Sequence, residues 1–161
     1  MMASKAAQVA DAITAAINAA TWSLDFRAER SYADFDDRLT DLERIKVDVV
    51  PKFDPQIELD TRATTGWELA VDVGVRKLFT QSDIDSTSGK IKLTALDQMV
   101  QLVEDLAQFL IEDRFTALNS IGAVWMETRI PALYIRDHLR EWSQFTGYIR
   151  LVFSLHCEVP A

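Results

Sequence analysis

Four groups of residues have types and spacings that could do chemistry. The stretch STSGKIK, residues 86–92, ends like a phosphate-binding loop. The complete pattern needs a glycine five residues before Gly89 and a serine or threonine directly after Lys90, which together cradle phosphates and hold magnesium. Isoleucine occupies both positions, 84 and 91. The sequence therefore argues against a nucleotide site in this stretch.

A calcium loop is the second possibility. Asp83, Asp85 and Thr87 have the spacing of the first three ligands of such a loop. The sixth position is Ser88 where a calcium loop has glycine, and the twelfth is Thr94 where it has a bidentate glutamate. A solvated loop is the better interpretation, because the strongest ligand is lacking.

The third group consists of Asp34, Asp36, Asp37 and Asp41, which crowd one connection. Oxygen-rich clusters can hold a hard cation. Nothing in the spacing imposes a coordination geometry, and acidic connections on protein surfaces are common. We interpret this cluster as a surface connection.

The fourth group is His156, Cys157 and Glu158, with His138 earlier in the chain. Zinc sites show C-x-x-C or H-x-x-x-H spacings, and none is present. Neighbouring side chains on a strand point to opposite faces, so His156 and Cys157 do not converge on one metal. We expect Cys157 to be a small buried hydrophobe. The sequence predicts no catalytic residue, no cofactor and no metal, so we expect a protein that is not an enzyme.

Composition favours one domain over residues 1–161, with 48% hydrophobic and 26% charged residues. The formal net charge of −8 argues against a protein that grips nucleic-acid phosphates, although repulsion would help DNA to slide past. Cys157 is the single cysteine, so no intrachain disulfide can form, which suggests a reducing compartment. No apolar run approaches the ~20 residues of a membrane helix, and the first 22 residues have the spacing of an amphipathic helix instead of a signal peptide.

Two main helices are predicted. Ser4 can cap a helix that runs to about Ala20, with an apolar stripe and many alanines. Thr94 with Asp97 resembles a capping box and begins a second helix that ends near Arg114. Between the strands and this second helix, residues 80–92 are polar and are predicted to form a long loop or flexible arm.

Period-two alternation predicts the strands. They fall in two regions, about residues 22–77 and about 121–158, with a short helical or irregular segment between the last two. The individual expectations are residues 22–29, 44–51 ending at Pro51, 56–62, 67–77, 121–130 and 145–159, with 56–62 and 67–77 forming a hairpin. No repeated βαβ unit occurs. The predicted fold class is α+β, a mostly antiparallel sheet of about five to six strands packed against two main helices.

The order of these elements resembles small tail-terminator or head-to-tail joining proteins of tailed bacteriophages. The resemblance covers nearly the whole chain and rests on order and spacing without a catalytic signature. The segments that carry it are AITAAINAATWSLDFRAERSY, DLERIKVDVVPKF, TRATTGWELAVDVGVRKLF, LDQMVQLVEDLAQFLIEDR and YIRLVFSLHCEV.

The resemblance implies a structural virion protein that assembles in the bacterial host cytoplasm. Several copies, commonly six, would close a homo-oligomeric ring in the phage neck. That ring would terminate the tail tube or join tail to head, touch tail-tube and connector proteins, and leave a channel that DNA crosses without specific binding. Two alternatives stay open: an adaptor or stopper ring nearer the portal, and a small metal- or ligand-dependent enzyme that uses the acidic connection and His138.

A ring needs two different complementary faces on each subunit. The stretch TGWELAVDVGVRK, residues 65–77, turns Trp67 and the residues in step with it inward. The opposite face combines small residues, which permit close approach, with charges that can set register. We predict that this face meets a neighbouring subunit, the alternative being a solvated face. Its residues are Glu68, Ala70, Asp72, Gly74 and Arg76.

The acidic balance suggests a lining for the channel. Carboxylates repeated around a ring would let DNA pass with little adhesion. The candidates come from the acidic connection and the polar loop, which could equally face outward. They are Asp34, Asp36, Asp37, Asp83 and Asp85.

Overall fold

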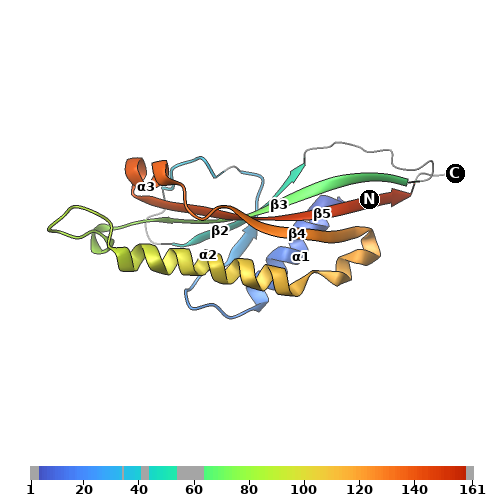
Figure 1. Cartoon of the computed structure of the whole chain (residues 1–161), viewed down its shortest axis with the longest axis horizontal. Coiled ribbons are helices and arrows are strands. Elements are labelled where there is room, and N and C mark those ends of the chain that lie inside the picture. The colour runs from blue at the N-terminus through green and yellow to red at the C-terminus, as the bar shows by residue number, and fades with distance from the viewer. Residues whose placement is uncertain (1–3, 34, 41–43, 54–63, 159–161) are drawn as a thin grey trace.

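The computed structural model describes residues 4–33, 35–40, 44–53 and 64–158. A five-stranded sheet runs through it, in the spatial order β1-β2-β3-β5-β4 (Figure 1). β1 pairs parallel to β2, and every other pair is antiparallel. The strands are β1 (Ala28–Arg30), β2 (Lys46–Phe53), β3 (Thr64–Leu78), β4 (Ala123–Ala132) and β5 (Gln144–Glu158). The predicted fold class, a mostly antiparallel α+β arrangement, is confirmed.

Both main helices cover one face of the sheet, called here the inner face. They are α1 (Lys5–Ala19) and α2 (Leu93–Asp113). A short helix, α3 (Arg136–Trp142), lies on the opposite or outer face (Figure 1). Two 3₁₀ turns, η1 (Gln81–Asp83) and η2 (Thr116–Ile121), precede and follow α2.

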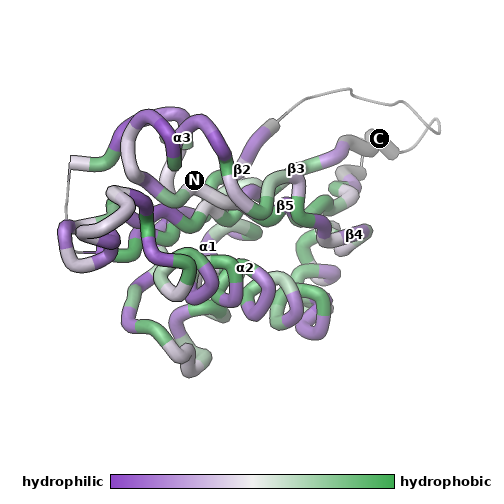
Figure 2. Tube along the Cα trace, turned by 60° about the vertical axis from the view of Figure 1, so that its left-hand side comes forward, coloured by the Kyte–Doolittle hydropathy of each residue, from purple (hydrophilic) through white to green (hydrophobic). Residues whose placement is uncertain are grey.

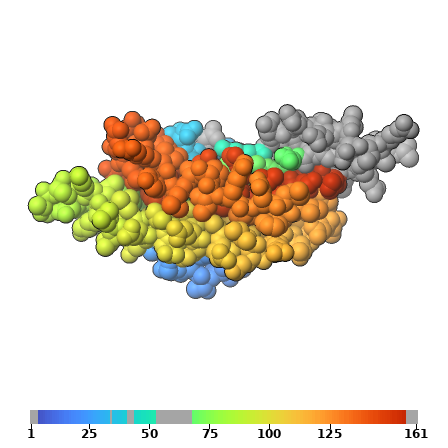
Figure 3. Space-filling view, in the orientation of Figure 1, coloured from blue at the N-terminus to red at the C-terminus, as the bar shows by residue number. Residues whose placement is uncertain are grey.

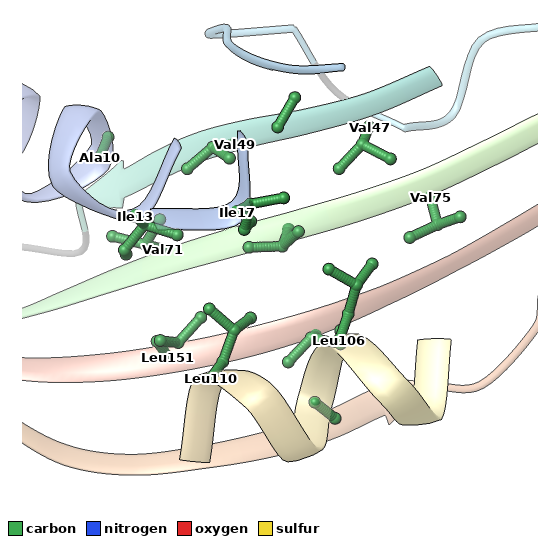
Figure 4. Packing of buried hydrophobic residues seen from close by; sticks show 14 of the residues in the cluster. Ala10, Ile13, Ile17, Val47, Val49, Val71, Val75, Leu106, Leu110 and Leu151 are labelled. Atoms are coloured by element: carbon green, nitrogen blue, oxygen red, sulfur yellow. The ribbon is translucent and has the colours of Figure 1, made fainter. Parts of the chain in front are cut away.

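The core lies between the inner face and the two helices. Alternate residues of β2, β3 and β5 point into it, and α1 adds one stripe that includes Ile13 and Ile17 (Figure 4). Leu106 and Leu110 of α2 pack on the same inner face, nearer to β5 (Figure 4). Figure 2 shows hydrophobic and hydrophilic residues alternating around α2, the pattern of a helix with one buried side. Burying each such leucine or isoleucine contributes about 1.5–3 kcal/mol.

Local signals explain where the helices begin. The Ser4 hydroxyl accepts a hydrogen bond from the Ala7 amide at 3.4 Å, so the predicted cap is confirmed. The cap predicted at Thr94 is wrong, because α2 begins one residue earlier and its N-cap is Lys92, with no side-chain capping bond. The Lys92 amide donates to the Asp83 carbonyl at 2.8 Å, and this bond sets the point from which the helix starts.

The first predicted strand is mostly not a strand. Residues 22–27 alternate in exposure, but pairing begins only at Ala28, where β2 becomes available as a partner. The aromatic side chains of this segment pack on the helices: the Trp22 ring lies 5.3 Å from Phe109, and its indole nitrogen donates to the Ile17 carbonyl at 2.9 Å. Helix packing therefore replaces sheet pairing here.

The prediction that the strand ends at Pro51 is wrong, since β2 continues to Phe53. The Val49 carbonyl accepts a bond from Ser31 on the β1 side, so Val49 and Pro51, two residues apart, both direct their backbone groups away from β3. β1 ends before it reaches Pro51, and proline is tolerated where its missing N–H would face no partner. The predicted strand 56–62, and the hairpin it would form, lie outside the described residues.

Candidate functional site

The outer face of the sheet is built from the charged and small residues that alternate with the core positions. Cross-strand pairing divides it into rows, because directly paired residues share a face. Asp72 pairs with Arg150, and Gly74 with Tyr148. The two halves of this face differ: one is covered by the chain itself, and the other is open.

A buried ion pair lies in the covered half. Arg76 of β3 donates to Asp48 of β2 at 2.8 Å, and each side chain is less than 5% exposed. The Arg76 Nε has no hydrogen-bond partner among the described residues. Two charges removed from water are tolerated only when they neutralise one another, so each side chain depends on the other.

Asp72 is the centre of a second charge cluster and is fully buried. Arg150 holds it in a bidentate contact, Nε to Oδ1 at 2.8 Å and a terminal nitrogen to Oδ2 at 3.0 Å. The Lys52 ammonium lies 3.3 Å from the same carboxylate. The hydrogen bond to Asp72 raises the pKa of Arg150 above its usual value, against the opposing effect of burial. The cluster joins β2, β3 and β5 on this face.

Phe35 covers Gly74. A side chain at position 74 would collide with the Phe35 ring, so the glycine makes room for it. The guanidinium of Arg76 lies 5.7 Å from the ring centroid and the ammonium of Lys52 lies 5.8 Å away, so two cations face the ring. Tyr148 stands 5.9 Å from it, in a tilted arrangement.

The interface predicted on this face is therefore wrong in part. Asp72, Gly74 and Arg76 are buried within the single chain, because Phe35 and the neighbouring charges occupy the space that a partner would need. Glu68 is exposed and Ala70 is half-buried. For these two residues, the subunit contact stays a prediction.

A polar network connects residues 35–40, which cover this half of the face, and α3 to the sheet. The buried Gln144 side chain accepts from the Leu39 amide at 2.7 Å, and donates to the Asp37 carbonyl at 3.2 Å and to Thr146 Oγ1 at 3.0 Å. Since Thr146 receives the Gln144 proton, its own hydroxyl proton can point to His138 Nδ1, 2.7 Å away. His138 is thus absorbed into a structural network.

The open half of the outer face forms a patch of two rows, each crossing β3, β5 and β4. It is called here the open strip. The first row is Glu68, Ser154 and Val124, and the second is Ala70, Val152 and Glu127. All six residues are exposed or half-buried, and the apolar Val124 is 38% exposed. Apolar and small groups fill the centre, with a carboxylate in each row.

The strand β4 borders this strip at the outer edge of the sheet. Its pairing with β5 is interrupted after Trp125 and again after Arg129. Met126, in the first interruption, is 58% exposed, and Ile130, in the second, is 38% exposed. Such bulges re-aim side chains at a sheet edge, and here each of them carries one exposed apolar residue.

The carboxylates predicted to line a channel fall at one end of the sheet. The Asp37 backbone touches Gln144, which pairs with Leu78 just before the loop that carries Asp83 and Asp85. Asp83 accepts bonds from the Thr80 backbone and hydroxyl, and Asp85 accepts from the Thr87 amide at 2.8 Å, so both also stabilise turns. Asp36 and Asp37 are exposed, and Asp34 lies outside the described residues.

Within the part of the chain that the structure describes, no three histidine, cysteine, aspartate or glutamate residues group as a metal site would require. A cleft of about 730 Å³ opens beside β1 and the start of β2, with Arg27, Glu29 and Asp48 among its lining residues. Its walls carry both signs of charge. No helix among the described residues has the length and apolarity needed to cross a bilayer.

Comparison with known proteins gives no family. No protein-family model matches the chain, and no curated protein shows a significant match to it.

Sequence reasoning missed the residues that decide which half of the outer face is open. Phe35 sits in an acidic connection and gave no periodic signal. Gly74 in mid-strand did signal a close approach, but the approaching group belongs to the same chain. Asp48, Asp72 and Arg150 lie on the outward parity of three adjacent strands, and opposite charges in register were the available clue.

Proposed function

We propose that this protein is a structural component of a phage virion that forms a ring in the neck, terminating the tail tube or joining tail to head. The sequence resemblance to tail-terminator and head-to-tail joining proteins motivates the proposal. The observation that carries it is the open strip: a small, partly apolar surface on a sheet face whose other half the chain seals with its own residues.

The two edges of the sheet support a directional contact over pairing of identical edges. At β1, the backbone N–H and C=O of Ala28 are both bonded to the Asn18 side chain, at 2.8 and 3.0 Å. That edge is therefore occupied from within the chain where Ala28 lies. At β4, the bulges interrupt the regular ladder. Blocked and interrupted edges disfavour unlimited strand addition, while a face patch can close a ring of defined size.

A solution experiment tests whether the strip is an interface. The mass of the purified chain is measured by light scattering over a wide concentration range, and oligomers are viewed by negative stain. We expect a closed ring that Ala70→Arg abolishes, because a charged side chain is forced into the apolar centre. Gln101→Arg, on the exposed side of α2, is the matched control and should leave the ring intact.

The proposal also has a test in the particle. The chain should be present in fixed stoichiometry in purified virions of its own phage, as mass spectrometry of intact particles would show. Absence from the particles would rule out a neck component, whatever the chain does in solution.

The proposed ring has a channel for DNA, and the acidic residues at one end of the sheet are proposed to line it. Changing Asp36, Asp37, Asp83 and Asp85 to asparagine should leave ring assembly intact and slow the passage of the genome, since repulsion of DNA is lost. DNA release from particles, followed by a fluorescent dye, measures the rate. Because Asp83 and Asp85 also stabilise turns, the pair Asp36→Asn and Asp37→Asn alone should show part of the effect. An unchanged rate in all variants would refute a channel lining.

A further inference from the structure

The loop of residues 80–92 has a defined, hydrogen-bonded conformation and is called here the arm. The two sides of the loop are joined by an isolated antiparallel bridge between Ile84 and Ile91. The Asp85 amide donates to the Lys90 carbonyl, and the Gly89 amide to the Asp85 carbonyl, each at 2.8 Å. Gly89 has φ of 70°, a value that favours glycine at the tip. Local hydrogen bonds thus shape the tip of the arm, while Ile91 at its base packs against the core.

The arm projects beyond the body of the molecule. In Figures 1 and 3 it extends past the end of the sheet, where β3 passes toward α2. Every residue from 85 to 90 is exposed. Leu93, at the base of the arm, is 75% exposed, the highest value among the large hydrophobic residues described. A shaped, protruding loop with an apolar group at its base is suited to insertion against another surface.

The arm and the open strip lie at opposite ends of the sheet. Glu68 in the strip and Leu78, the last residue of β3 before the arm, are ten positions apart, a length of about 33 Å at the rise of an extended strand. The arm therefore cannot reach the strip of its own chain. Contact between them is possible only from one copy to the next.

The two surfaces each carry a charged and an apolar group that can pair between copies, Lys90 with Glu68 and Leu93 with Val124. The arm presents the exposed Lys90 ammonium, with the exposed Asp85 bonded to Lys90 through the backbone, and Leu93 at its base. The strip presents the Glu68 carboxylate, and the Glu127 carboxylate with Arg129 at 3.7 Å, around apolar side chains, of which Val124 is the most exposed. Lysine against carboxylate and leucine against valine satisfies both kinds of group at once.

We propose that the arm of one copy docks on the open strip of the next copy. The inference rests on the proposed ring and names the two surfaces that close it. An arm at one end and a strip at the other make a heterologous contact, in which each subunit gives one surface and receives the other. Such contacts generate a closed ring when the rotation between copies divides a full turn.

Cross-linking tests the contact directly. In a Cys157→Ser background, Ser88→Cys at the arm tip is combined with Ser154→Cys in the strip, and the protein is treated with a short bismaleimide at high concentration. We expect a ladder of linked chains on a denaturing gel. The control pairs Ser88→Cys with Glu104→Cys, an exposed position on α2, and should give no ladder.

Charge reversal gives a second, independent readout. Lys90→Glu should weaken self-association by about tenfold, and Glu68→Lys by a similar factor, as expected for charges at the rim of an interface. The double reversal should regain most of the loss, because the pair is restored with exchanged signs. Lys90→Arg keeps the charge and should keep the affinity.

The results separate this contact from the neck assignment. A ladder specific to positions 88 and 154, with rescue by the double reversal, supports the contact. A ring that forms without this cross-link overturns the contact and leaves the neck proposal standing. A chain that stays monomeric at every concentration, or that links equally to position 104, also overturns it. The neck proposal is then judged by the presence of the chain in particles.

Discussion

Replacing Asp48 by asparagine tests whether the buried ion pair holds the covered half of the outer face together. The asparagine keeps the shape of the side chain and removes its charge. Arg76 would then carry an uncompensated charge at 4% side-chain exposure, with its Nε already unpartnered among the described residues. Breaking a buried pair from one side costs about 3–5 kcal/mol.

A loss of that size is measurable and large. For a chain of this length, each kcal/mol lowers Tm by about 2–4 °C, so the variant should melt roughly 6–20 °C below the wild type. Urea denaturation at neutral pH gives the free energy of unfolding. Glu127→Gln is the control, because its partner Arg129 lies 3.7 Å away and both side chains are more than half exposed; we expect a cost below about 1 kcal/mol.

The double replacement of Asp48 by leucine and Arg76 by methionine separates electrostatics from packing. Exchanging a whole buried pair for apolar side chains of similar volume is commonly neutral or stabilising, so the double variant should be within about 1 kcal/mol of the wild type. A cost below about 1 kcal/mol for Asp48→Asn would refute the reasoning, since it would mean that water reaches Arg76. A double variant as unstable as the single one would refute it also.

Three further changes follow from the packing. Gly74→Ala should cost about 1–3 kcal/mol in urea denaturation because its methyl group meets the Phe35 ring, and adding Phe35→Leu should recover part of the loss. Asn18→Ala should cost about 1–3 kcal/mol and promote aggregation, seen as rising light scattering, because the Ala28 backbone loses both of its partners. Leu106→Ala should cost about 2–5 kcal/mol, measured the same way, by leaving a cavity between α2 and the sheet.

Periodic signals predicted the long elements well. The alternation over residues 67–77 lies inside β3, and the apolar stripe after residue 94 lies inside α2. Both elements place one side in the core along many turns or pleats, so a single misplaced residue changes little. The predicted first strand was too long, because residues 22–27 alternate in burial although no neighbouring strand pairs with them.

The open half of the candidate site was partly predicted. Glu68 and Ala70 were identified from the outward parity of the strand, and both remain accessible. Val124 and Val152 complete the strip, and they were not identified, because their place depends on which strands neighbour β3 and in which register. These pairings connect residues that lie far apart in the sequence, such as Ala70 with Val152 and Val124 with Ser154, and no local pattern encodes them.

Local sequence patterns are enough to give the periodicity of each element, the acidic balance and the mixture of small and charged residues on the second face of β3. These properties depend on neighbours within a few positions, where helix and strand geometry leaves few choices. Which part of that face is free depends on contacts between residues that are distant in the sequence. Asp48 and Arg76, Asp72 and Arg150, and Phe35 over Gly74 are brought together by sheet pairing and by a connection that folds back over the sheet. The same charges that alternation assigns to solvent are buried there because partners from distant strands neutralise them.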